Sequence, residues 1–284
     1  MKLGVVGLLP PWQQIDVGAA QEVRSAGYRG VSIFFQKPLE ADPAAVQKLK
    51  RVLDSADLEV AQANGWYEVL VHPDDALRAE GIRGLQALTH IGRLLDAKTV
   101  YVRPGSLSPT GAWYPHPGNY APEVFERLVN SLRQAAQTAA AEAMVLALEG
   151  HVLSLLDTPQ RMRDVLEAVA SPALQFNTDP VNFIGTVKDA FEPSRVLNEL
   201  FSLLGKYTAA AHLKDMAVQD HLVLRIDEVV IGQGTMDYGL LLRQMEQINP
   251  DMYGIIEHLP DEKIPFARAG LMRAAGTAGI HLIT

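Results

Sequence analysis

Eight short apolar segments recur along the chain, each followed by a stretch of helical character, and this repeat constrains the fold more than any other feature. Most of the segments are nearly continuous hydrophobic runs, not alternating ones. That pattern is typical of strands buried on both faces, as in parallel sheets. The expected strands cover residues 3–9, 30–35, 58–64, 99–105, 144–150, 173–179, 208–215 and 253–259.

The stretches between these segments carry helix signals. Residues 43–54 begin with proline, which is favoured in the first turn of a helix. Residues 158–169 begin with Thr-Pro, an N-cap residue followed by a first-turn residue. Gly27 marks the end of the first helix. The expected helices cover residues 17–26, 43–54, 74–95, 121–143, 158–169, 195–204, 237–247 and 263–277.

A strand followed by a helix, eight times over, predicts an α/β protein. Two doubly wound domains would also give this alternation, but no linker, low-complexity tract or break in composition divides the chain. One (β/α)8 barrel is the simpler arrangement, and such barrels commonly contain about 250 residues. We therefore predict one TIM barrel domain over residues 1–284.

Composition excludes several classes of function. No cysteine is present, which excludes a disulfide framework, a zinc site with cysteine ligands and thiol catalysis. The lack of cysteine is in keeping with the cytoplasmic location that we expect. The formal net charge is −8 and the basic residues are scattered, so we expect no nucleic-acid partner. No apolar run reaches about 18 residues, so we expect no membrane partner either.

Two connections are long and irregular, at residues 103–122 and 214–238. The first is rich in proline, glycine and aromatic residues. Both follow expected strands, so both belong to the barrel rim on which TIM barrel enzymes build their active sites. Because long loops in a compact domain are usually functional, we expect these two to shape the site.

Four consecutive strand ends carry a residue type that binds metals. Glu149, Asp179, His212 and Glu257 each follow an apolar run, at the ends of expected strands five to eight. Each alone has an ordinary structural explanation, but neighbouring barrel strands bring their ends together, so all four can converge on one ion. Three carboxylates and one imidazole favour Mn²⁺, Mg²⁺ or Co²⁺ over a closed tetrahedral zinc site.

The motifs LALEGH, NTDPVN, AHLKD, GQG-x-x-DY and IIEH resemble those of the xylose isomerase-like TIM barrels. This superfamily includes ketose 3-epimerases, hydroxypyruvate isomerases, inosose dehydratases and endonuclease IV. The resemblance covers nearly the whole chain, and its most specific parts are HLKD and the Gly232–Gln233–Gly234 turn. It implies a metal-dependent enzyme of carbohydrate metabolism, and a homodimer is in keeping with it because barrels of this family often pair.

The resemblance also implies roles for individual residues. It makes Glu149, Asp179, His212 and Glu257 the ligands of one divalent metal, for which Mn²⁺ is expected and Mg²⁺, Co²⁺ or Zn²⁺ are alternatives. Glu149 and Glu257 are also the expected catalytic acid and base. The residues expected to bind substrate are His151, Asn182, Lys214, Asp215, Arg103, Trp66 and Asn64.

One residue departs from the family pattern. Many relatives carry a histidine three residues after the acid of strand six, where this chain has Asn182. An amide can bond a sugar hydroxyl but is a poor metal ligand and cannot act as a base. The segment before Gly232, IDEVVI, also lacks an Asp-x-His pair. A nuclease site with three zinc ions, as in endonuclease IV, is therefore not expected.

The resulting hypothesis is a metal-dependent isomerase or epimerase of a small sugar or polyol. The metal polarises a carbonyl, one glutamate removes the neighbouring proton to give an enediolate, and the other glutamate returns a proton. Two alternatives remain open at this point. One is an inosose-type dehydratase that uses the same metal and base but expels a hydroxyl group. The other is a binding or accessory barrel that has lost catalysis.

Overall fold

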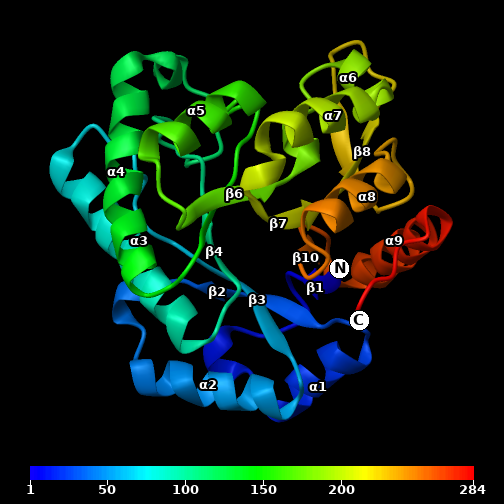
Figure 1. The fold of residues 1–284 in the computed structure, drawn as a ribbon, viewed down its shortest axis with the longest axis horizontal. Coiled ribbons are helices and arrows are strands. Elements are labelled where there is room, and N and C mark those ends of the chain that lie inside the picture. Colours follow the sequence, from blue (N-terminus) through cyan, green and yellow to red (C-terminus); the bar gives the residue numbers. More distant parts are fainter.

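A computed structural model describes residues 1–284 and confirms the predicted (β/α)8 TIM barrel (Figure 1). Eight parallel strands close in the order β1-β10-β7-β6-β5-β4-β3-β2. They are β1 (Lys2–Val5), β2 (Gly30–Phe35), β3 (Glu59–Gly65), β4 (Thr99–Val102), β5 (Leu146–Leu148), β6 (Leu174–Thr178), β7 (Thr208–Leu213) and β10 (Tyr253–Ile256).

Nine α-helices surround the barrel. They are α1 (Val17–Ser25), α2 (Pro43–Ser55), α3 (Asp75–Leu94), α4 (Pro122–Ala141), α5 (Pro159–Val169), α6 (Val187–Phe191), α7 (Pro193–Leu204), α8 (Tyr238–Ile248) and α9 (Ile264–Ala278). The predicted Thr-Pro start of α5 is confirmed, since the Thr158 side chain accepts a hydrogen bond from the Arg161 backbone N–H. Gly27 follows α1 with φ +85°, a conformation that favours glycine.

The closure of the barrel depends on close approaches among β1, β2 and β10. β1 pairs with β10 on one side and with β2 on the other, with Gly4 opposite both Ile255 and Gly30. A Cβ atom at Gly30 would lie 2.6 Å from the ring of Tyr253. Only glycine at position 30 therefore allows the Tyr253 ring to fill the base of the barrel.

Two elements differ from the sequence prediction. The short helix α6 precedes α7, where only a helix over 195–204 was expected. The second long connection, expected to be irregular, contains an antiparallel hairpin of β8 (Asp215–Val218) and β9 (Ile226–Val229). β9 reads IDEV, is short and is only partly buried, so it lacks the apolar run by which the barrel strands were recognised.

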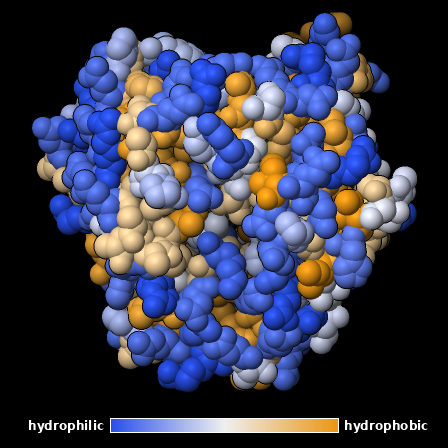
Figure 2. Space-filling model, in the orientation of Figure 1, coloured by the Kyte–Doolittle hydropathy of each residue, from blue (hydrophilic) through white to orange (hydrophobic).

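The apolar core fills the space between the strands and the surrounding helices. Strands β4, β5 and β10 are buried at every residue, which explains their continuous hydrophobic sequences. On the face seen in Figure 2, hydrophilic residues cover most of the surface and apolar residues form scattered patches. None of the helices has the length and apolar character needed to cross a membrane.

The amino-terminal rim of the barrel is held by an ion cluster around Glu59, the first residue of β3. Its carboxylate accepts hydrogen bonds from Lys2 Nζ at 3.0 Å, Arg29 Nη2 at 3.0 Å and the Tyr253 hydroxyl at 2.9 Å. Burial raises the pKa of Glu59, but the bonds from Lys2, Tyr253 and Arg29 outweigh it and lower the pKa to about 2. This end of the barrel lies opposite the strand ends that carry the predicted ligands.

The cluster predicts an acid dependence of stability. Because the pKa of Glu59 is about 2 in the folded protein and 4.5 ordinarily, its stabilisation is complete above pH 4.5 and is lost as the pH falls towards 2. A Glu59→Gln variant should therefore be less stable at neutral pH and show a shallower loss of unfolding free energy over that interval. Urea unfolding at several pH values measures both effects. Parallel curves for the two proteins would show that the cluster has no such role.

Candidate metal centre and active site

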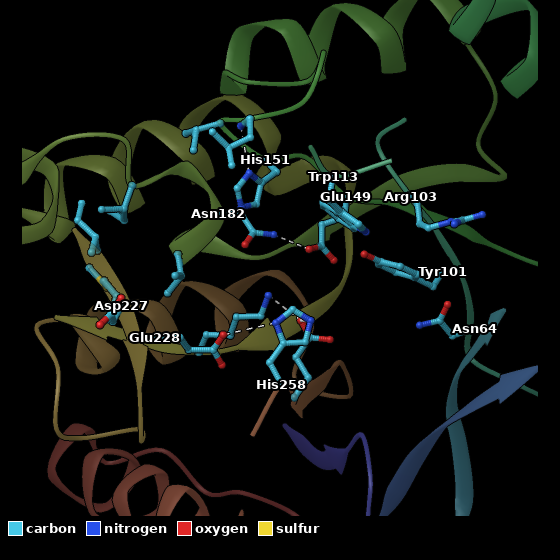
Figure 3. Close-up of a pocket in the computed structure, with 18 of the residues that line it drawn as sticks. Asn64, Tyr101, Arg103, Trp113, Glu149, His151, Asn182, Asp227, Glu228 and His258 are labelled. Carbon is cyan, nitrogen blue, oxygen red and sulfur yellow. Dashed lines mark hydrogen bonds and ion pairs between the residues drawn. The ribbon is translucent and has the colours of Figure 1, made fainter. Parts of the chain in front are cut away.

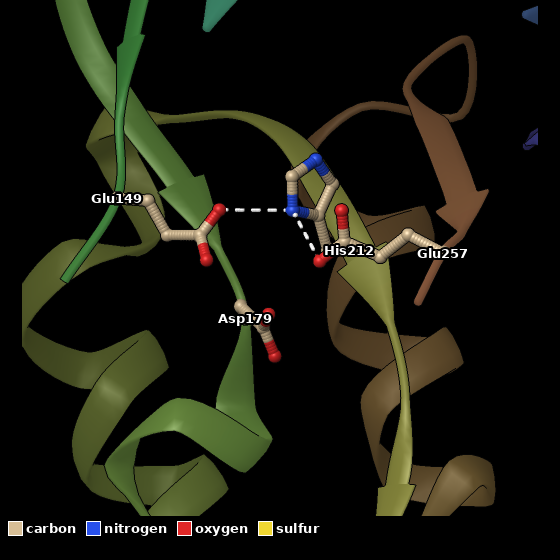
Figure 4. A group of neighbouring side chains, drawn as sticks. All are labelled: Glu149, Asp179, His212 and Glu257. Atoms are coloured by element: carbon tan, nitrogen blue, oxygen red, sulfur yellow. Dashed lines mark ion pairs between the residues drawn. The ribbon is translucent and has the colours of Figure 1, made fainter. Parts of the chain in front are cut away.

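The structure brings Glu149, Asp179, His212 and Glu257 together at the carboxyl-terminal end of the barrel (Figure 4). One potential ligand atom from each residue lies within 4.8 Å of the others, and all four residues are at most 7% exposed. Their strands β5, β6, β7 and β10 are consecutive in the barrel. The register pairs Ile255 with His212, so Glu257 comes just above the imidazole.

His212 lies between the two glutamates that were expected to act as acid and base. Its Nδ1 is 2.8 Å from Glu149 Oε2 and 3.0 Å from Glu257 Oε1. Burial alone would lower the pKa of His212. The negative charges of Glu257 and Glu149 outweigh burial and raise the pKa to about 10. Figure 4 shows the two carboxylates approaching the imidazole from different sides.

Lys214 adds a second cation to the cluster. Its Nζ lies 2.6 Å from Asp179 Oδ2 and 2.8 Å from Glu257 Oε1. Burial raises the pKa of Asp179 to about 7 despite this neighbour. Burial also raises the pKa of Glu257, but His212 and Lys214 together hold it well below its ordinary value. The floor of the site is thus a dense, buried arrangement of opposite charges.

These residues fit a divalent metal ion. Asp179 Oδ2 and His212 Nδ1 contact only the charged groups of Lys214, Glu149 and Glu257. Asp179 Oδ1 is buried without a hydrogen-bond partner. Polar atoms in that state are rare because they lose hydration without compensation. Carboxylate oxygens with one imidazole nitrogen are a donor set for Mg²⁺ or Mn²⁺. A divalent cation would give Asp179 Oδ1 the partner that it lacks.

Polar side chains inside the barrel orient the cluster from below. Gln62 Oε1 lies 2.9 Å from His212 Nε2, and Gln62 Nε2 donates to Asn177 Oδ1 at 3.1 Å. Asn177 donates to Glu149 Oε2 at 2.8 Å, and Asn182 donates to Glu149 Oε1 at 2.5 Å. Neighbours of this kind fix the tautomer and rotamer of metal ligands. Sequence reasoning missed Gln62 and Asn177, although each stands two residues before a predicted site residue on a strand, and so faces the same side.

A cavity of about 560 Å³ opens above the cluster (Figure 3). The residues predicted to bind substrate that line it are Asn64, Trp66, Arg103, His151, Asn182 and Lys214. Burial, aided by the charge of Lys214, lowers the pKa of His151 to about 4, so its ring is neutral near pH 7. The lining residues that sequence reasoning missed include Tyr101, whose ring is 5.4 Å from that of His212, and Glu228 of the β8–β9 hairpin.

Asp215, which was also predicted to bind substrate, does not line this cavity. Its Oδ1 accepts hydrogen bonds from the backbone N–H groups of Met216 and Met236, and its Oδ2 from those of Gly232 and Gly234, at 2.8–3.0 Å. Successive residues of an extended strand face opposite ways, so Lys214 reaches the cavity and Asp215 turns away. A Cβ atom at Gly234 would lie 2.2 Å from Asp215 Oδ1, so the turn can approach the carboxylate this closely only with glycine at position 234.

Loss of the Asp215 carboxylate should therefore destabilise the protein. An Asp215→Ala variant leaves four backbone N–H groups without their acceptor, and we expect the unfolding free energy to fall by roughly 3 kcal/mol or more. Urea unfolding measures the change. Asp220→Ala, an exposed aspartate in the same connection, is the matched control and should unfold like the wild type. Equal midpoints for all three proteins would contradict the anchoring role.

Known proteins share this architecture. A D-tagatose 3-epimerase-like protein is 16% identical, with a TM-score of 0.77, and 98% of each chain is covered. A xylose isomerase-like TIM barrel protein from Mycobacterium smegmatis, in complex with magnesium, is 14% identical, with a TM-score of 0.74, and covers 98% of this chain and 96% of its own. A 3-keto-D-glucoside 4-epimerase from E. coli is 17% identical, with a TM-score of 0.73, and covers 97% and 99%. At these identities the likeness shows the fold.

Sequence comparison gives the family. Among the curated proteins, none matches this chain in sequence. The model of the xylose isomerase-like TIM barrel family, however, matches residues 20–275, which is most of the chain. The predicted resemblance is thereby confirmed, and this chain belongs to the xylose isomerase-like TIM barrel family.

Proposed function

We propose that this chain is a metal-dependent isomerase or epimerase that acts on a carbohydrate. The observation that carries the proposal is the convergence of Glu149, Asp179, His212 and Glu257 beneath a cavity large enough for a sugar. The names of two structural neighbours, a D-tagatose 3-epimerase-like protein and a 3-keto-D-glucoside 4-epimerase, add support for this reaction class.

The four converging side chains would hold the metal ion. We propose Mn²⁺ because the donors are hard and rich in oxygen, and Mg²⁺, Co²⁺ or Zn²⁺ are alternatives. One structural neighbour is described in complex with magnesium. When bound, the ion would polarise a substrate carbonyl and stabilise the negative charge that develops after proton removal.

Glu149 and Glu257 are the proposed acid and base. One takes the proton from the carbon beside the carbonyl, which gives an enediolate, and the other returns a proton from another side and inverts that carbon. The two asparagine bonds to Glu149 hold its carboxylate in one orientation. Lys214 and His212 keep Glu257 ionised, because both lower its pKa.

The wall of the cavity would bind the sugar. Asn64, Asn182 and His151 offer amide and imidazole groups to hydroxyls, and the half-exposed Trp66 offers an apolar ring face. Arg103 and Lys214 supply positive charge at two positions on the wall. These assignments make the cavity a polyol site with the reacting carbon placed over the two glutamates.

Lys214 supports a second candidate, a dehydratase. Its ammonium group lies 2.8 Å from Glu257 Oε1, so the pair could protonate a departing hydroxyl while Glu149 removes the proton next to the carbonyl. Such a lyase would use the same residues on an inosose-type substrate.

Product analysis tests the proposal and separates the two reactions. Protein loaded with Mn²⁺ is incubated with a panel of ketoses and inososes. The products are separated by chromatography, and their molecular masses are measured by mass spectrometry. The proposal predicts a new sugar isomer of unchanged mass from at least one substrate. Loss of one water would assign the dehydratase, and unchanged substrates across the panel would count against both reactions.

A further inference from the structure

A second cavity of about 600 Å³ adjoins the one above the metal centre. It lies between the segment that follows β3 and the long connection that follows β4. Trp66 and Arg103 line both cavities, so these two side chains form the boundary between them. In Figure 3, Arg103 and Asn64 lie on the side of the first cavity away from Asp227. Each cavity alone falls within the range of about 300–1,000 Å³ typical of ligand pockets.

Contacts with two aromatic rings hold the Arg103 side chain in place at this boundary, and one of its N–H donors has no acceptor. Its guanidinium lies 4.7 Å from the ring centre of Trp66 and 4.3 Å from that of Tyr67. Its backbone N–H donates to the Tyr67 hydroxyl at 3.1 Å, and its Nη2 donates to the Tyr67 carbonyl. Arg103 is 7% exposed, and its Nε is buried without any acceptor. Arg103 thus forms a fixed, positively charged part of the wall between the two cavities.

The second cavity carries hydrogen-bonding groups suited to hydroxyls. Nδ1 of His72 accepts the Asp74 backbone N–H at 3.0 Å, and Nδ1 of His116 accepts that of Gly118 at 3.1 Å. Because each Nδ1 is an acceptor, the ring proton lies on Nε2, which is a donor with no partner in the protein. Glu68 adds a carboxylate acceptor to the same lining. Donors and acceptors together with the Trp66 ring match a second sugar ring better than an apolar group.

We propose that the substrate spans both cavities and is a sugar that carries a second sugar through a glycosidic bond. The reacting sugar lies over Glu149 and Glu257, and the second sugar lies between the loops after β3 and β4. Trp66 and Arg103 lie beside the substrate at the boundary. The proposal rests on the proposed function for the nature of the reacting sugar, and on the second cavity for the rest.

Direct binding tests this proposal without reference to turnover. Magnesium-loaded protein is titrated by calorimetry with D-fructose and with the glucosylated fructoses turanose, maltulose and isomaltulose. We expect at least one disaccharide to bind about tenfold or more tightly than D-fructose. Equal or weaker binding of every disaccharide, including no binding, would overturn the proposal.

A bulky substitution in the second cavity localises the effect. Ser108 lines the second cavity and not the first, so Ser108→Trp should remove the advantage of the disaccharide and leave D-fructose binding unchanged. Pro109→Trp, at an exposed position of the same lining, is a second variant that requires no change in the buried structure. Ser171→Trp, in a groove before β6 at the other end of the barrel, is the matched control. An undiminished advantage in both folded variants would place the second sugar elsewhere and overturn the proposal.

Failure of this proposal and of the proposed function can be told apart. Suppose that a disaccharide binds tightly but exchanges no deuterium in D₂O. That result would support the second cavity as a sugar site and contradict the proposed isomerase reaction. Deuterium exchange into D-fructose, without tighter binding of any disaccharide, would support the proposed isomerase reaction and contradict the second sugar site.

Discussion

A Glu149→Gln variant is expected to lose turnover by about 10²- to 10⁴-fold, the contribution of a positioned acid–base group. The amide of glutamine keeps the shape of the carboxylate but cannot take a proton. Asn177 and Asn182 donate to the two oxygens of Glu149, so in the variant one of these asparagines must turn its amide oxygen towards the new NH2 group. Steady-state assays on the substrate found by product analysis measure the loss.

The same variant should stay folded and bind metal more weakly, not lose it, because the substituted amide would still offer one oxygen. Metal content after dialysis distinguishes a loss of chemistry from a loss of the site. Glu126→Gln on the exposed face of α4 is the matched control and should keep full activity. Full activity in Glu149→Gln would contradict the assignment of Glu149 as acid or base.

Metal removal is expected to have a comparably large effect on both activity and stability. Three buried carboxylates converge at this site, and a divalent ion bound only by the folded protein stabilises it by about 2.7 kcal/mol at 100 times its dissociation constant. Chelation should therefore abolish turnover and lower the melting temperature, and Mn²⁺ should restore both. Differential scanning fluorimetry with and without Mn²⁺ measures the thermal part.

A His212→Ala variant isolates the cause of this effect. It should show a clearly smaller rise in melting temperature with Mn²⁺ than the wild type, because one of the four proposed ligands is missing while the three carboxylates remain. His281→Ala, an exposed histidine near the end of the chain, should keep the full response to Mn²⁺. A metal-dependent rise that is undiminished in His212→Ala would place the ion elsewhere in the protein.

The barrel and the four converging residues could be read from the sequence because both depend on local patterns. A strand buried on two faces needs a continuous apolar run, and the first titratable residue after the run falls at the rim. Glu149 and Glu257 follow such runs directly, and strands five to eight are neighbours in any barrel of this topology. The convergence on one point therefore follows from strand order, without knowledge of any loop.

The rest depends on side-chain direction and loop path, which no local pattern contains. Lys214 and Asp215 are adjacent in sequence but face opposite sides, so only Lys214 reaches the cavity. Gln62 and Asn177 look like ordinary polar residues until the barrel places them under His212 and Glu149. The second cavity depends on how the connection after β4 folds over the segment after β3, a tertiary arrangement that its proline-rich sequence does not specify.

Proton exchange tests the central claim most directly. Metal-loaded protein is incubated in D₂O with ketoses, their glucosylated derivatives, inososes and hydroxypyruvate, and proton NMR spectra are recorded after Mn²⁺ is removed. We expect deuterium to enter a carbon beside the carbonyl of at least one substrate, and we expect no such exchange with chelated protein or with Glu149→Gln. Exchange that is equally fast in the Glu149→Gln variant, or absent from every substrate with the fully loaded protein, would contradict it.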